Sequence, residues 1–192
     1  ANDLFYKVDK LKVLKSFDAK SSIQSKNYIF QIYFSNENQF IIGKHAILIQ
    51  GKKNKNIPFI GAKTIVEDEF GDLWIGANYL LKTSKQEIDK LSNYDLYSFD
   101  KRVVLKERTN SLIRNDKTIW AGTNNGIYKI ENNKTIYLSK NYPKTQTIIS
   151  KLYFEKETNL LFVATNSNGL FVFQNDKLIQ HYYICFKSNK FT

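Results

Sequence analysis

The chain has 192 residues, of which 42% are hydrophobic and 15% aromatic, and its 14 Phe and 12 Tyr favour strands, so the composition predicts an all-β fold. No apolar run approaches the roughly 18 to 20 residues that cross a bilayer, so no membrane span is expected in this segment, and Cys185, the single cysteine, excludes an internal disulfide. The net charge of +11 comes mostly from dispersed lysines, with only three arginines, which argues for a solvated surface and against a nucleic-acid partner, while an anionic ligand stays an alternative.

The first predicted elements are two strands within residues 4–14. Their Tyr6-Lys7-Val8-Asp9 matches Tyr128-Lys129-Ile130-Glu131, which lies in the second half of a repeat unit further along the chain. Residues 1–20 are therefore expected to form half of such a unit.

Four repeats follow, in each of which a short apolar run ends in a small residue, crosses a polar turn and re-enters an apolar run. Gly43, Gly76, Gly122 and Ala164 mark equivalent points, 33, 46 and 42 residues apart. Repeats of about 40 to 50 residues that contain only strand-type segments are typical of propeller blades. The expected blades are residues 21–61, 62–107, 108–145 and 146–192.

The second blade departs most from the pattern. Its strand at residues 64–68 and turn at 70–72 lead into Leu73-Trp74-Ile75-Gly76, and an insertion at 82–95 precedes strands at 96–99 and 102–105. Within the insertion, a capping Ser84 and the spacing of Ile88 and Leu91 predict a helical turn.

The third and fourth blades each divide into four strands by alternation and turn residues. The expected strands are 109–114, 118–123, 127–131 and 135–138 in the third blade, and 148–154, 160–165, 170–174 and 177–183 in the fourth. The fold class is therefore a β-propeller segment of about four and a half four-stranded antiparallel blades. Four and a half blades are at the low end for a closed ring. We expect a fragment of a larger propeller, whose end blades are covered by further blades. The alternatives are that the first two strands complete a fifth blade with the C-terminal tail, or that a second copy caps the arc.

The segment Ile65-Val66-Glu67-Asp68-Glu69-Phe70-Gly71-Asp72-Leu73-Trp74-Ile75-Gly76 resembles the two-component regulator propeller repeat, and Trp120-Ala121-Gly122-Thr123-Asn124-Asn125-Gly126-Ile127-Tyr128 is similar to its second half. The first repeat departs from the pattern with Ile41 in place of Trp, and the fourth with Phe162 and Ala164. The resemblance implies a periplasmic sensor propeller of a bacterial hybrid two-component system, which often recognises carbohydrate breakdown products.

Several conspicuous residues have structural interpretations. Trp74 and Trp120 repeat at an apolar strand position and are expected to pack between blades, and Cys185 is expected to be a packed hydrophobe. His45 and His181 lack companions at ligand spacing, so no metal site is predicted. The acidic cluster at residues 67–69 is interpreted as a solvated turn, and the sequence indicates no cofactor and no catalytic residue.

The turns between second and third strands and the connections into each new first strand emerge on the same face of a propeller. Asn side chains there both donate and accept hydrogen bonds, which suits hydroxyl-rich ligands, although Asn is also common in tight turns for its backbone preferences. The candidate ligand-binding residues are Lys44, His45, Asn78, Tyr79, Arg108, Asn110, Asn124, Asn125, Asn166 and Asn168.

The sequence therefore predicts a non-catalytic, extracytoplasmic sensor or interaction propeller that binds an oligosaccharide or an anionic ligand. Two alternatives stay open. One is a propeller enzyme acting on polysaccharide, as a lyase or glycosidase, and the other is a scaffold for protein contacts only.

Overall fold

The structure, a computed structural model, describes residues 4–9, 12–18, 29–35, 38–51, 54–59, 61–84, 87, 103–132 and 134–183. These residues form one two-stranded and four four-stranded sheets. The two-stranded sheet pairs β1 (Leu4–Asp9) with β2 (Lys12–Asp18) in antiparallel fashion.

Each of the four larger sheets is an antiparallel meander built from consecutive strands. The first sheet contains β3 (Ile29–Phe34), β4 (Gln39–Gly43), β5 (Ala46–Gln50) and β6 (Lys55–Pro58), and the second contains β7 (Thr64–Glu67), β8 (Leu73–Gly76), β9 (Leu80–Thr83) and β10 (Val103–Leu105). The third contains β11 (Thr109–Asn115), β12 (Thr118–Thr123), β13 (Gly126–Glu131) and β14 (Lys134–Tyr137), and the fourth contains β15 (Ile149–Glu155), β16 (Leu160–Thr165), β17 (Leu170–Gln174) and β18 (Lys177–Tyr182).

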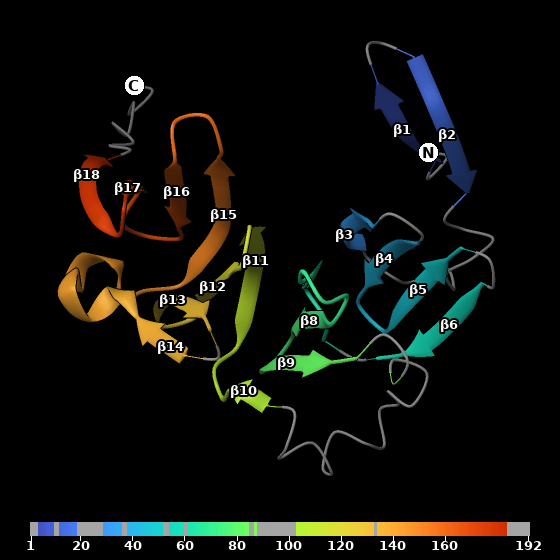
Figure 1. Ribbon diagram of the computed structural model, residues 1–192, viewed down its shortest axis with the longest axis horizontal. Helices are drawn as coiled ribbons and strands as arrows, with labels where there is room; N and C mark the ends of the chain where they lie inside the picture. Colours follow the sequence, from blue (N-terminus) through green and yellow to red (C-terminus); the bar gives the residue numbers. More distant parts are fainter. Residues whose placement is uncertain are drawn as a thin grey trace, which may run out of the picture.

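The four sheets stand around a common centre as blades (Figure 1). The first strands β3, β7, β11 and β15 lie innermost, and β6, β10, β14 and β18 lie outermost. The predicted fold class, an all-β propeller segment of four-stranded antiparallel blades, is confirmed. The described residues form an arc, and the hairpin β1–β2 lies at its β3 end (Figure 1).

Asn and Asp residues close the turns at one end of the blades. Asp116, Asn132, Asn159 and Asn175 have φ between 49° and 56°, in the left-handed region that Asn and Asp tolerate better than other side-chain-bearing residues. They lie in the turns after β11, β13, β15 and β17. The candidate ligand-binding face is at the opposite end, where β11 and β15 begin.

Apolar side chains fill the spaces between successive blades in three layers. One core cluster joins the first and second sheets, a second contains Trp74 and Ile119, and a third contains Trp120 and Phe171. Trp74 and Trp120 are each only 5% exposed, so the prediction that both pack between blades is confirmed. At Gly122, an added Cβ would lie 2.6 Å from Cγ2 of Ile149, so a glycine is needed for the close approach of β15.

A repeated hydrogen bond also links neighbouring blades. A side-chain oxygen on the first strand of one blade accepts from a backbone N–H on the first strand of the next: Gln31 Oε1 from Ile65 (2.7 Å), Thr64 Oγ1 from Leu112 (3.2 Å) and Ser111 Oγ from Leu152 (3.0 Å). The innermost strand of each blade has no further strand on its inner side, so these bonds give its inward backbone N–H groups an acceptor. They fix how far each blade is staggered against the next.

The acidic cluster differs from its expected role. The interpretation of residues 67–69 as a solvated turn is wrong for Asp68, which is 7% exposed. Its carboxylate accepts from Trp74 Nε1 (3.0 Å) and from the backbone N–H groups of Phe70 (3.0 Å) and Asp72 (2.9 Å), and it pairs with Lys82 (3.0 Å). Asp68 therefore caps the β7–β8 turn from inside.

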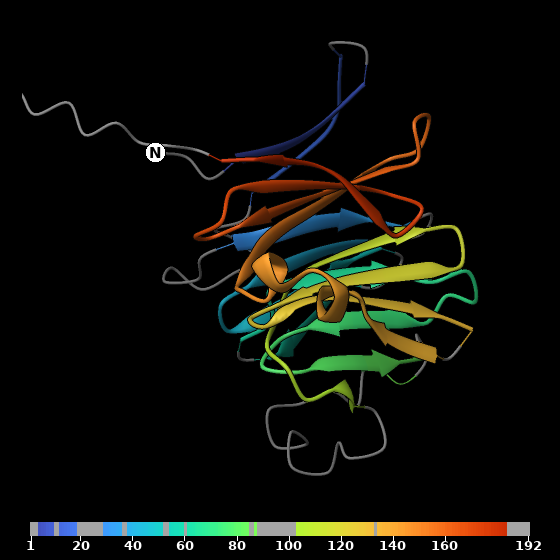
Figure 2. The same ribbon diagram turned by 90° about the vertical axis from the view of Figure 1, so that its left-hand side faces the viewer.

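Two segment predictions also need correction. Residue 138 does not end the fourth strand of the third blade, because Leu138 begins the 3-10 turn η4 (Leu138–Asn141), which leads to η5 (Pro143–Thr145) on the outside of the arc (Figures 1 and 2). Lys82 and Thr83, expected in the insertion, belong to β9, with Lys82 paired opposite Trp74. Of the rest of the insertion and its expected helical turn, only Ser84 and Glu87 are described, and the strand expected at 96–99 lies outside the described residues.

Candidate ligand-binding site

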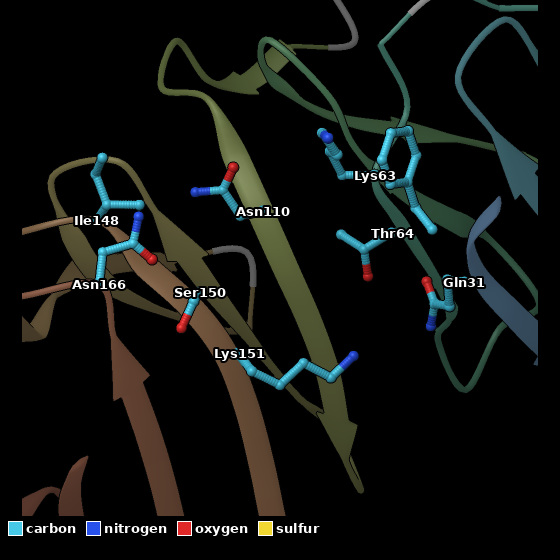
Figure 3. A pocket seen from close by; sticks show the side chains of 9 residues that line it. Gln31, Lys63, Thr64, Asn110, Ile148, Ser150, Lys151 and Asn166 are labelled. Carbon is cyan, nitrogen blue, oxygen red and sulfur yellow. The ribbon is translucent and has the colours of Figure 1, made fainter. Parts of the chain in front are cut away.

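A pocket of about 350 Å³ lies on the inner side of the arc and draws side chains from all four blades. It is lined by Phe30, Gln31, Lys63, Thr64, Asn110, Ile148, Ser150, Lys151 and Asn166. Figure 3 shows these side chains arranged around the space between β3, β7, β11 and β15. The site is therefore a property of the assembled blades and not of any single one.

Equivalent positions of the innermost strands supply the core of this lining. The pairing register shifts at Phe30 in β3, at Asn110 in β11 and at Ser150 in β15, so each of these residues is an extra residue opposite its partner strand. Such bulges redirect side chains. Lys63, just before β7, occupies the same position in the second blade, where its N–H donates to the Gly76 carbonyl (2.7 Å).

The second blade contributes a positively charged side chain, Lys63, to the pocket. Lys63 Nζ lies 3.5 Å from the centre of the Phe30 ring, a cation–π contact that holds the ammonium at the pocket. Burial, followed by repulsion from Arg108 and Lys44, lowers the pKa of Lys63 below its ordinary value. Lys44 and Arg108 therefore lie close enough to Lys63 to form one electropositive cluster with it.

The structure brings some of the sequence-predicted residues together. Arg108 donates from Nη1 to Asn78 Oδ1 at 2.7 Å, which links two neighbouring blades beside Lys63. Asn110 donates from Nδ2 to Asn124 Oδ1 at 3.0 Å, which places Asn124 behind a pocket-lining residue. Of the predicted residues, only Asn110 and Asn166 line the pocket itself.

Four other predicted residues do not line the pocket, because their side chains bond within the turns or are exposed to solvent. Asn125 donates to Glu107 Oε2 (2.6 Å), and Asn168 donates to the Lys144 carbonyl (2.7 Å), so both amides are engaged within the turn region. His45 and Tyr79 are exposed at the β4–β5 and β8–β9 turns and do not line the pocket. His181 stacks on Phe171 and bonds the Asn168 carbonyl, as part of the fourth blade's packing.

Sequence reasoning missed seven lining residues, because it searched the turns and not the first strands. The missed residues are Phe30, Gln31, Lys63, Thr64, Ile148, Ser150 and Lys151. A signal was present in the adjacent polar pairs Lys63-Thr64, Asn110-Ser111 and Ser150-Lys151, which recur at the start of the first strands. One or both residues of each pair line the pocket, and Asn110 and Ser150 are bulges.

A second pocket of about 280 Å³ opens between the third and fourth blades and contains none of the predicted site residues. Its charged groups are already paired, since Lys129 bonds Asp176 at 2.9 Å. In the described part of the chain, no group of three His, Cys, Asp or Glu side chains is placed to hold a metal ion, and Cys185 lies outside that part. None of the described helices has the length and apolarity of a membrane span.

Comparisons with known proteins identify the fold. No family model and no curated protein matches the sequence. The structure is similar to the extracellular domain of BT4673 from B. thetaiotaomicron, described as a putative one-component or hybrid two-component system, with TM-scores of 0.58 and 0.59 and sequence identities of 17% and 14%. The matches cover 87% and 84% of this chain, but only 24% and 23% of that domain.

A further similar structure is PorZ, a surface component of the type-IX secretion system of Porphyromonas gingivalis, with a TM-score of 0.57, 12% identity and coverage of 92% of this chain and 31% of that one. At these identities the likeness establishes the fold. The chain is a β-propeller segment of about four blades, and the resemblance to sensor propellers of two-component systems is confirmed at that level. The chain spans about a quarter of the length of the BT4673 domain.

Proposed function

We propose that the chain is the ligand-sensing or interaction part of an extracytoplasmic propeller belonging to a two-component sensor. The observation that carries this proposal is the pocket to which all four innermost strands contribute side chains. A ligand held there touches four blades at once. Its binding energy can therefore favour one relative arrangement of blades over another, which is what a sensor requires.

The lining chemistry supports a hydroxyl-rich ligand such as an oligosaccharide. Amides of Gln31, Asn110 and Asn166 and hydroxyls of Thr64 and Ser150 offer donors and acceptors, and Phe30 offers an apolar surface. This set of groups suits recognition better than acid–base catalysis, so we propose a binding role without turnover. A periplasmic location is proposed from the similar structures described as extracellular domains.

The proposal is tested by calorimetric titration of the chain with a panel of oligosaccharides, alongside an assay for their depolymerisation. We expect binding without turnover. Asn166→Ala should weaken that binding several-fold, because the exposed amide lines the pocket, whereas Asn175→Ala, at the other end of the blade, should not. Turnover would support the enzyme alternative instead, and the absence of binding to every glycan would favour the scaffold.

A further inference from the structure

The pocket contains two lysines, Lys63 and Lys151, and no carboxylate among its nine lining residues. The lysines come from different blades. Lys151 extends from β15 toward the side of the pocket on which Thr64 and Gln31 lie (Figure 3), while Lys63 is held over Phe30 at the start of the second blade. Two cations from non-adjacent blades therefore share one cavity.

Lys63 is further surrounded by like charge. Lys44 and Arg108 repel it, and Arg108 hydrogen-bonds the neutral amide of Asn78. Among the residues that the structure describes, none of Lys44, Lys63, Arg108 and Lys151 pairs with a carboxylate. The site carries a local excess of positive charge that is not neutralised within the described chain.

The chain neutralises comparable lysines elsewhere. Lys82 lies over the Trp74 ring and pairs with Asp68 and Asp72, at 3.0 and 3.1 Å. Lys129 lies over the Trp120 ring and pairs with Asp176 at 2.9 Å. Lysines that contact aromatic rings between blades thus have acidic partners, whereas Lys63, which contacts Phe30 at the pocket, has none among the described residues.

The position of Lys151 adds an independent argument. In the three preceding blades the equivalent residues, Gln31, Thr64 and Ser111, accept the inter-blade hydrogen bond. A lysine ammonium has donors and no acceptor, so Lys151 cannot make that bond. No described blade follows the fourth, so this position has no neighbouring N–H to bond, and the fourth blade places a cation at the pocket there.

We propose that the pocket selects ligands that carry an oxyanion, either a carboxylate or a sulfate ester, bound between Lys63 and Lys151. This inference rests on the proposed function, because it specifies the class of ligand that the same site senses. At about 350 Å³ the cavity is at the lower end of small-molecule sites. It suits one acidic sugar unit, whose hydroxyls meet Asn110 and Asn166.

The test is calorimetric titration at low ionic strength with galactose, galacturonate, galactose 6-sulfate and sodium sulfate. Both anionic sugars are expected to bind roughly tenfold or more tightly than galactose, and their affinity to fall with added salt. Lys63→Gln and Lys151→Gln should each remove most of that preference. The matched control Lys156→Gln changes an exposed lysine in the turn after β15, at the far end of the same strand, and should bind as the unchanged chain does.

The outcomes separate this inference from the proposed function. Equal binding of galactose and its acidic forms, or unchanged binding by both pocket variants, would overturn the oxyanion site while leaving a neutral-sugar sensor intact. Binding of sulfate alone would support the oxyanion site and contradict sugar recognition. If only galacturonate or only galactose 6-sulfate binds, the source of the oxyanion is identified, and failure of all four probes would overturn the inference. Thermal unfolding of each variant verifies that it is folded.

Discussion

Asp68 shows how a single buried carboxylate organises a blade. Burial raises the pKa of this carboxyl, but hydrogen bonds from Trp74, Lys82 and the backbone of Asp72, together with the Lys82 charge, outweigh burial and hold the pKa below its ordinary value. Burial lowers the pKa of Lys82, but its hydrogen bonds with Asp68 and Asp72 and the charges of these two carboxylates outweigh burial and raise the pKa of its ammonium. The ionised pair therefore belongs to the folded state.

Replacing this carboxylate should destabilise the second blade. We expect Asp68→Ala to lower the free energy of unfolding by about 1.5–3 kcal/mol, because it leaves Trp74 Nε1 and turn N–H groups without their acceptor. Urea unfolding followed by tryptophan fluorescence measures the effect. Asp72→Ala, which removes only the more exposed partner of Lys82, should cost less, and equal losses would contradict the assigned role.

The stability contributed by Asp68 should also depend on pH. A carboxyl whose pKa is lower in the folded than in the unfolded chain contributes its full stability above its unfolded pKa. That contribution is lost as pH falls through the lowered, folded pKa. Unfolding midpoints measured from neutral to acidic pH should therefore decline less steeply in Asp68→Ala than in the unchanged chain, and parallel declines would contradict this.

The role of a single residue could be predicted from the sequence where the same residue recurs at the same position of a repeat. Trp74 and Trp120 occupy the same strand position, so their burial could be predicted from periodicity. Asp68 could not be placed in the same way, because an acidic residue at a strand end is usually solvated. Its burial depends on the distance to Trp74 Nε1, which only the folded turn sets.

The first strand is the element that joins blade to blade. Its Oγ or Oε acceptor and the next blade's N–H form a repeated link, so the loss of one acceptor leaves a buried donor unpaired. We expect Thr64→Val, which keeps the side chain's shape, to cost about 1–3 kcal/mol in urea unfolding. Thr147→Val removes an exposed hydroxyl bonded to Ser167 and serves as the control, with little expected loss.

Close approach between elements should be equally sensitive to added volume. Gly122→Ala is expected to cost about 1–3 kcal/mol, because the new Cβ would meet Ile149 Cγ2 and Cβ at 2.6 and 3.0 Å. Combining it with Ile149→Ala should cost less than the sum of the two single changes, as measured in a double-mutant cycle. Simple additivity would mean that β15 moves away without strain.

At the element scale, strand positions in the third and fourth blades could be predicted to within a residue or two, because apolar runs alternate with Asn and Gly turns. The 3-10 turns at 138–145 could not. They depend on Ser139, whose Oγ accepts from Ile127 N–H (2.9 Å) and contacts Thr145, so the chain leaves the strand to satisfy a donor on β13. The pattern of apolar residues in the sequence does not reveal a side-chain hydrogen bond of this kind.

At the scale of the whole molecule, the fourth blade has one sheet face that no described blade covers. The equivalent face of the third blade packs against the fourth. Tyr153 and Phe162 stand where Ile113 and Trp120 pack against the following sheet, and Tyr153 is 57% exposed. Tyr182, on β18, is 53% exposed. Such a face is typical of one that another sheet covers.

We therefore expect the isolated chain to self-associate weakly through this face. Light scattering with size-exclusion chromatography should show a mass that rises with protein concentration, and Tyr153→Glu should suppress the rise. Phe70→Glu, which changes an aromatic side chain that is 81% exposed in the β7–β8 turn, is the control and should not. A constant monomer mass for all three proteins would contradict the expectation.

The candidate site is also a whole-molecule property, which explains why the sequence indicated its neighbourhood better than its lining. Turn residues can be assigned to one end of a blade from local pattern, and of the residues assigned in this way Asn110 and Asn166 line the pocket. Lys63 and Ser150 are 87 residues apart in the sequence. They share a pocket because the bulges of β3, β11 and β15 and the start of β7 lie at the same level of the four blades. That coincidence is set by packing between blades.

The start of each first strand, which is a bulge in β3, β11 and β15, meets two requirements of a repeat protein at neighbouring residues. One residue of each pair, such as Thr64 or Ser111, bonds the neighbouring blade, and the residue before it lines the pocket. The inward residues Phe30, Lys63, Asn110 and Ser150 differ completely in chemistry although the blades share one backbone plan. The side chains that face the axis can therefore differ from blade to blade while the hydrogen bond that joins the first strands of successive blades is kept in the first three.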